Sequence, residues 1–117
     1  PLYSSAASDV YKRQIRTTAQ DAYIGKYANS YDNKCLLVTA IKGYLVGLEQ
    51  SGILRAGSSS VGIDLAHQEA YLQSVGTDTS RMSQQEIKEA NTADKVFLEA
   101  SIKILDAIED ISLNITI

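Results

Sequence analysis

Two runs of alternating apolar and polar side chains occupy the end of the chain, between Lys95 and Ile117. The apolar positions are Val96, Leu98, Ala100, Ile102 and Ile104 in the first run, and Ile111, Leu113, Ile115 and Ile117 in the second. A two-residue period puts alternate side chains on opposite faces of a strand, so each run predicts a strand with one buried face. The edge left by the second strand can pair with another strand of this chain or with a neighbouring chain.

Helical spacing of apolar residues predicts two longer helices upstream. The first runs from Ile15 to near Gly25, with apolar positions at Ile15, Ala19, Ala22 and Tyr23. The second has the strongest stripe of the chain, at Leu37, Val38, Ile41, Tyr44, Leu45 and Leu48. The side chains able to cap its start are Asn29, Ser30 and Asp32. Gly52 suits its end, because glycine adopts the left-handed conformation that often terminates helices.

Shorter elements fill the middle of the chain. Val61–Leu65 alternates briefly and predicts a short strand, after which Asp64 can cap a helix over Ala66–Ser74. Ser83–Glu86 has the spacing of a capping box and predicts a second short helix. Together the elements predict one α+β domain, in which two longer helices and the short ones pack on a small sheet. That sheet is expected to contain Val61–Leu65 and the two terminal strands.

The composition excludes several classes of protein. With 117 residues, of which 44% are apolar, the chain has the size and composition of one globular domain. No apolar run approaches membrane-spanning length, and a net charge of −3 argues against a general role in nucleic-acid binding. Residues 1–60 carry seven bases against four acids, whereas residues 61–117 carry four bases against ten acids. A basic first half and an acidic second half favour charge-complementary stacking of identical subunits, although two ordinary solvated faces explain this charge distribution as well.

No set of residues has the spacing of a catalytic, cofactor or metal site. His67, the only histidine, lies in the first turn of a predicted helix, and the serines at 58–60 lack the turn motif of a nucleophile. Cys35 is expected to be a buried thiol and, being the only cysteine, excludes an internal disulfide. The acidic turn at 106–110 lacks the ligand spacing of a calcium loop. We therefore expect a protein that is not an enzyme and uses no cofactor or metal.

The beginning of the chain differs in character from the rest. The segment Ser4–Gln14 resembles a translated sequencing-adapter read of the kind found at the start of metagenomic reading frames. We expect residues 1–14 to be a non-native segment that contributes nothing to the fold, and residues 15–117 to form the domain. The natural protein is then expected to begin far upstream.

Five stretches, in their order and spacing, resemble the C-terminal domain of contractile phage tail sheath proteins. They are Tyr31–Lys34, Ile63–Leu65, Ala70–Leu72, Met82–Ile87, and Lys95–Asp110 with Leu113–Ile115. The likeness covers about residues 15–117 and is greatest to the branch found in prophages and phage-tail-like particles of Gram-positive bacteria. In this family many copies stack helically around a rigid tube, and terminal arms swap strands between neighbours.

The resemblance implies a mechanical role. It predicts a structural subunit of a contractile tail sheath, located in the virion tail and assembled in the cytoplasm of the bacterial host. Its partners would be other copies of the sheath subunit and the tail tube protein, without nucleic acid and without membrane insertion. Contraction of the sheath would drive the tube through the host envelope.

The resemblance also indicates which residues make contacts. The final strand is expected to exchange with a neighbouring subunit, so that its removal would leave a folded monomer that forms no tubes. The side chains buried by this exchange would be Ile111, Leu113, Ile115 and Ile117. The basic residues expected to face the tube or the next subunit are Lys26, Lys34 and Lys42.

Two alternatives stay open. A sheath-like subunit of a bacterial contractile injection or secretion system would share the mechanism. A small α/β ligand-binding domain or enzyme would instead need a concave pocket with convergent polar groups.

Overall fold

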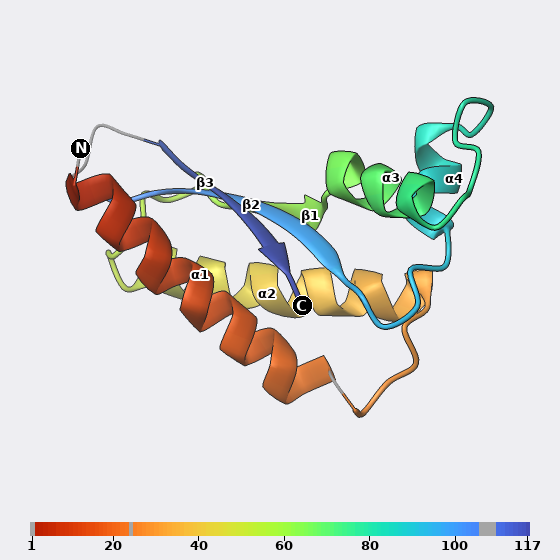
Figure 1. Ribbon diagram of the computed structural model, residues 1–117. Coiled ribbons are helices and arrows are strands. Elements are labelled where there is room, and N and C mark those ends of the chain that lie inside the picture. The colour runs from red at the N-terminus through yellow and green to blue at the C-terminus, as the bar shows by residue number, and fades with distance from the viewer. Residues whose placement is uncertain (1, 24, 106–109) are drawn as a thin grey trace.

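The computed structural model describes residues 2–23, 25–105 and 110–117. Within them lie four helices and a three-stranded antiparallel sheet (Figure 1), which confirms the predicted α+β fold. The helices are α1 (Leu2–Tyr23), α2 (Tyr31–Gln50), α3 (Leu65–Ser74) and α4 (Gln84–Glu89). The strands are β1 (Ser60–Ile63), β2 (Phe97–Lys103) and β3 (Asp110–Thr116).

The sheet has the order β1-β2-β3, so the two outer strands are its edges. Near the start of β2, Leu98 lies opposite Ile63 on β1 and opposite Ile115 on β3. Beyond the end of β3, the backbones of Val96 and Ile117 exchange both of their hydrogen bonds, at 3.1 and 2.9 Å. The last strand is therefore paired with β2 of its own chain along its whole length.

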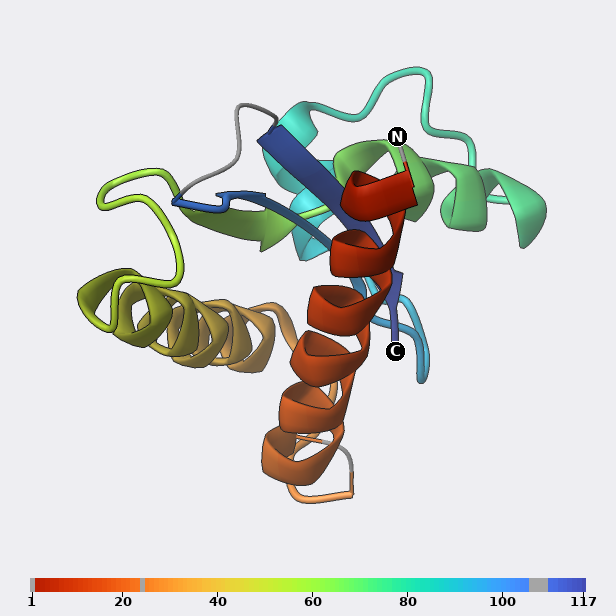
Figure 2. The same ribbon diagram turned by 90° about the vertical axis from the view of Figure 1, so that its left-hand side faces the viewer.

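Helices α1 and α2 cover one face of this sheet. Helix α1 packs against β3, and α2 lies nearer β1 (Figures 1 and 2). On the opposite face, α3 reaches the start of β2, where the Tyr71 and Phe97 rings lie 5.6 Å apart. The rest of that face carries no helix in the described part of the chain.

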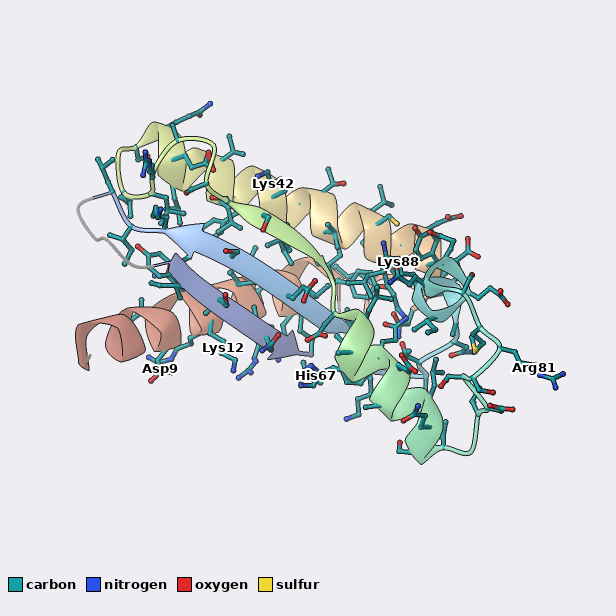
Figure 3. The ribbon with its side chains drawn as sticks, turned by 90° about the horizontal axis from the view of Figure 1, so that it is seen from above. Asp9, Lys12, Lys42, His67, Arg81 and Lys88 are labelled. Atoms are coloured by element: carbon teal, nitrogen blue, oxygen red, sulfur yellow. The ribbon has the colours of Figure 1, made fainter. Side chains whose placement is uncertain are left out.

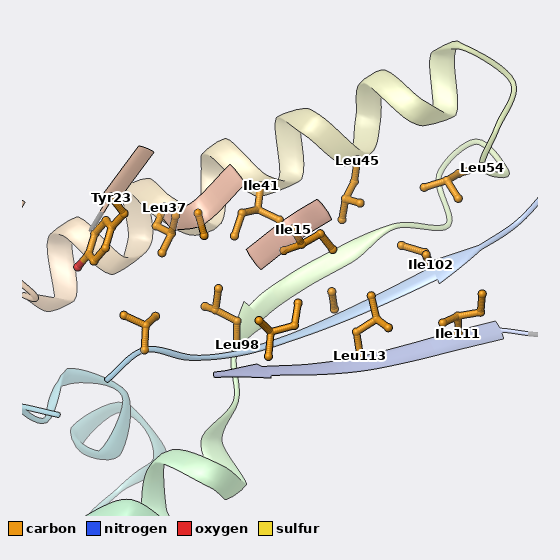
Figure 4. Packing of buried hydrophobic residues seen from close by; sticks show 14 residues of the cluster. Ile15, Tyr23, Leu37, Ile41, Leu45, Leu54, Leu98, Ile102, Ile111 and Leu113 are labelled. Atoms are coloured by element: carbon orange, nitrogen blue, oxygen red, sulfur yellow. The ribbon is translucent and has the colours of Figure 1, made fainter. Parts of the chain in front are cut away.

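The core lies between the two long helices and the sheet (Figure 4). Its strand residues are those that alternation predicted, namely Val96, Leu98, Ala100, Ile102, Ile111, Leu113 and Ile115. Its helix residues are Ile15, Ala19, Tyr23, Leu37, Ile41 and Leu45. Ile104 and Ile117 are only partly buried, because they lie at the ends of their strands. The two periodicities therefore identified the buried faces correctly.

The residues predicted to bound α2, α3 and α4 are also confirmed. Among the three candidate caps of α2, Ser30 accepts a hydrogen bond from the backbone of Asn33, at 3.2 Å. Gly52 follows the helix with φ of +77°, in the left-handed region that favours glycine. Asp64 caps α3, and Ser83 opens α4 with both bonds of a capping box. Local side-chain chemistry thus sets these boundaries.

Helix α1 begins earlier than expected, at Leu2 rather than near Ile15. Between residues 9 and 14, Tyr11 packs partly against the core, and Gln14 accepts a hydrogen bond from the Tyr44 hydroxyl, at 2.6 Å. Among the side chains of α1 that the structure describes, the fully buried positions nevertheless begin at Ile15. The non-native origin of residues 1–14 stays a prediction, but this segment does contact the domain.

A chain that starts at Ile15 is expected to keep its fold. Because Tyr11 is only partly buried and the hydrogen bond between Gln14 and Tyr44 is exposed, the free energy of unfolding should fall by no more than about 1 kcal/mol. Urea denaturation of the two chains measures this difference. A larger loss would show that the first turns of α1 belong to the native domain.

Candidate functional site

The predicted exchange strand contributes to the core of its own chain. Ile111, Leu113 and Ile115 are only 6%, 2% and 1% exposed, while Ile117 is half-buried. Between them Ser112, Asn114 and Thr116 face solvent. The structure thus confirms a strand with one buried face and pairs it within the chain. Exchange of this strand with a neighbour stays a prediction.

The face of the sheet opposite the long helices is polar and shallow. Two cross-strand rows lie on it, Ser60–Ser101–Ser112 and Gly62–Glu99–Asn114. They line a hollow of about 310 Å³, and among its described lining residues Glu99 is the only ionisable one. A catalytic pocket brings a nucleophile or an acid–base pair together with other polar groups. This hollow does not have that arrangement, so it does not favour the enzyme alternative.

The three predicted contact lysines are not brought together. Lys26 is exposed beyond α1, whereas Lys42 is half-buried on α2 and donates a hydrogen bond to the carbonyl of Ser59 (Figure 3). Lys34 is only 1% exposed. The expectation that Lys34 faces a partner is therefore corrected, because its side chain lies inside the domain. Of the basic residues in the first half, Lys34 alone is buried, and Arg13, Arg16, Lys26 and Arg55 are exposed.

Lys42 belongs to an anchor for the loop before β1. The carboxylate of Glu49, also on α2, accepts hydrogen bonds from the backbone of Gly57 at 2.8 Å and of Ser59 at 3.4 Å. Hydrogen bonds from Ser59 and Gly57, together with the charge of Lys42, hold the pKa of Glu49 below its usual value. The loop is consequently held on α2 by one acidic and one basic side chain.

Lys34 belongs to a second anchor, at the turn that leads into β2. Its ammonium donates to the hydroxyl of Thr92 at 2.6 Å, and that hydroxyl donates to the carbonyl of Lys95, also at 2.6 Å. The side-chain amide of Asn29 donates to the carbonyls of Ala93 and Lys95, at 2.7 and 2.9 Å. Ala93 has φ of +54°, which is uncommon for a residue other than glycine. These bonds hold the turn in that conformation.

This anchor was not predicted from the sequence, although the sequence contains a signal for part of it. Lys34 lies three and seven residues before Leu37 and Ile41, so helical spacing places it on the buried stripe of α2. The contribution of Asn29 and Thr92 had no such signal, because they are 63 residues apart and meet only in the folded chain.

The buried Lys34 predicts a distinctive pH dependence of stability. Burial lowers the pKa of its ammonium. Between that lowered pKa and the ordinary lysine value of about 10.4, the unfolded chain binds a proton that the folded chain does not. The free energy of unfolding should therefore rise with pH in this interval, and Lys34→Met should abolish that rise.

Urea denaturation between pH 7 and pH 10 measures this effect, with Lys26→Met as the control because Lys26 is exposed. The comparison between variants also cancels the titration of Tyr23 and Tyr44, whose pKa values burial raises. Equal pH profiles for the Lys34 variant and the parent would contradict the prediction.

The remaining candidate side chains have structural positions. His67 is exposed at the start of α3 (Figure 3), with its Nδ1 2.7 Å from Oδ2 of the capping Asp64. Cys35 is half-buried, which corrects the expected full burial. In the part of the chain that the structure describes, no three potential metal ligands lie together. Of the acidic turn, residues 106–109 lie outside the described residues.

These observations define a class of protein. The sheet is open, its two edge strands have unpaired outer edges within the described chain, and the ionisable side chains with described tertiary contacts act as helix caps and loop anchors. Such an arrangement is typical of a domain that acts through its surfaces and its strand edges. None of the described helices has the length and hydrophobicity needed to cross a membrane.

The comparison with known proteins gives the family. Residues 5–117 match the phage tail sheath C-terminal domain family. The chain is also 36% identical, over 107 residues, to the tail sheath protein of Clostridium phage phiCD119. That alignment covers 92% of this chain and 30% of the relative, so the chain spans less than a third of the relative's length. The chain belongs to the phage tail sheath C-terminal domain family, which is a family of structural proteins.

Proposed function

We propose that this chain is the C-terminal domain of a contractile tail sheath subunit. In this proposal many copies polymerise around the tail tube, and contraction of the sheath drives the tube through the host envelope. The observation that carries the proposal is the family match over residues 5–117. The partners are further sheath subunits and the tube protein, and the assembled protein lies in the virion tail after assembly in the host cytoplasm.

The geometry of the sheet supports a role in assembly. A strand from a neighbouring subunit with the sequence of β3 would find the same backbone partners on β2 and the same apolar surface on α1. Exchange of identical elements between subunits requires no new type of contact. We therefore retain Ile111, Leu113, Ile115 and Ile117 as the exchange strand, now with β2 as its acceptor.

A subunit of a bacterial contractile injection system is the second candidate. It would use the same domain in the same mechanism. The relative from a Clostridium phage favours the phage tail. A tube-protein gene within a prophage next to the coding sequence would support this choice, whereas a neighbouring secretion-system operon would contradict it.

Assembly of the full-length subunit tests the proposed function. The subunit is expressed with and without the tube protein encoded beside it, and the products are examined by negative-stain electron microscopy. We expect hollow tubes of regular helical symmetry, with longer and more uniform tubes when the tube protein is present. Soluble subunits that form no polymer under either condition would contradict the proposal.

Reversing the charge of Lys26 and Lys42 is expected to weaken the association of sheath with tube. At low salt reversal of the exposed Lys26 alone should reduce binding by about fivefold, equivalent to about 1 kcal/mol for an exposed charge pair, and the double reversal should reduce it further; high salt should reduce both differences. Co-sedimentation with preformed tubes measures the binding. Because Lys42 lies beside Glu49, circular dichroism must first show that the fold is intact.

The matched control is Arg81→Glu, an exposed charge that lies away from Lys42, in the segment between α3 and α4 (Figure 3). It should leave binding unchanged. Equal binding by the double variant and the parent at low salt would remove both lysines from the tube interface.

A further inference from the structure

The exchange strand is already in place on its own sheet. All seven residues of β3 have partners on β2, from Phe97 opposite Thr116 to Lys103 opposite Asp110. Val96 and Ile117 then close the ladder with two backbone hydrogen bonds. The edge of β2 at which a neighbour's strand would enter is therefore occupied in the single chain.

We propose that β3 acts as an autoinhibitory strand in the free subunit. By pairing with β2 it closes the acceptor site, so that a neighbour's strand enters only after β3 has left. This inference rests on the proposed function, because it concerns the strand that the sheath subunit exchanges. It adds a regulatory state, in which the unassembled subunit is closed by its own strand.

The physical argument follows from the identity of the two strands. The closed and the exchanged forms contain the same ladder and bury the same side chains, so most of their interaction free energy cancels. The balance then depends on the local concentration of neighbouring strands, which is low for free subunits and high at the growing end of a polymer. Free subunits are expected to stay closed, and a lattice that positions a neighbour favours the open form.

Release of β3 also provides a kinetic barrier. Ile111, Leu113 and Ile115 leave the core when the strand departs. The backbone groups of β2 that face β3 then lose their hydrogen-bond partners. An exposed, unpaired strand edge pairs readily with other chains, which leads to aggregation. Closure by β3 therefore protects the acceptor edge until a correct neighbour is present.

A disulfide between Ser101 and Ser112 provides a direct test. These residues lie opposite each other on the polar face of the sheet, away from the core. Since Val96 and Ile117 form a hydrogen-bonded pair, the alternation of an antiparallel ladder makes Ser101 and Ser112 a non-hydrogen-bonded pair. The close approach of Cα atoms in such pairs suits a disulfide.

The variant is Ser101→Cys with Ser112→Cys in the full-length subunit, on a Cys35→Ala background that leaves only the two introduced thiols in this domain. The free subunit is oxidised, and peptide mass spectrometry with non-reducing electrophoresis identifies an intrachain link. Polymerisation is then followed by light scattering and electron microscopy, with and without reductant. Each single cysteine variant is the control.

We expect the oxidised free subunit to be linked within one chain and to polymerise at less than a tenth of the reduced rate, with recovery on reduction. Oxidation after assembly should instead link neighbouring chains into covalent ladders.

A linked subunit that polymerises as fast as the reduced one would overturn the inference while the proposed function stands. Failure of the thiols to link in the free subunit would also overturn it. A parent subunit that forms no tubes would contradict the proposed function itself and this inference with it.

Discussion

A chain that ends at Asp110, and so lacks residues 111–117, is expected to lose its stable fold. The deletion exposes the surface of α1 and β2 that Ile111, Leu113 and Ile115 cover. Burial of these three side chains stabilises the domain by about 5–9 kcal/mol, which is comparable with the whole stability of a domain of this size. The structure therefore changes the result expected from the sequence, which was a folded monomer deficient only in assembly.

Circular dichroism and urea denaturation of the 117-residue chain and its truncation measure this effect. The matched control replaces the exposed residues of the same strand, Ser112, Asn114 and Thr116, with alanine. It should change the free energy of unfolding by much less, because no buried contact is lost. Cooperative unfolding of the truncated chain within about 1 kcal/mol of the parent would show that β3 is a dispensable arm in solution.

Leu98→Ala is expected to have the largest effect of any single substitution to alanine in the sheet. Leu98 is 0% exposed and lies between Ile63 and Ile115 in the central strand. Removing its side chain leaves a cavity that neighbours on both sides cannot easily fill, because the backbone ladder holds them. We expect a loss of about 3 kcal/mol in the free energy of unfolding, within the range of 2–5 for buried leucine.

Thermal and chemical denaturation check this value. The next residue, Glu99, points to the opposite, exposed face of the same strand. Glu99→Ala should therefore change stability by no more than about 0.5 kcal/mol. Equal losses for the two variants would contradict the assignment of the buried face.

Much of the fold was predictable because it depends on local chemistry. The alternation in 96–104 and 111–117 identified two strands and their buried faces, since the pleat of a strand repeats every two residues. The caps Ser30, Asp64 and Ser83 were predictable because a side-chain oxygen meets a backbone N–H only three residues away. Five stretches likewise indicated the family.

Some properties of the candidate site were decided only by the tertiary structure. The alternation of β3 shows which of its faces is buried, but the same ladder forms whether β2 belongs to this chain or to a neighbour. Likewise, the sequence alone leads one to expect a lysine at the surface. In the folded chain Lys34 is instead hydrogen-bonded to Thr92, which lies in a turn 58 residues away. Sequence periodicity determined the faces of each element. What covers those faces depends on contacts between segments far apart in the chain, which only the folded arrangement specifies.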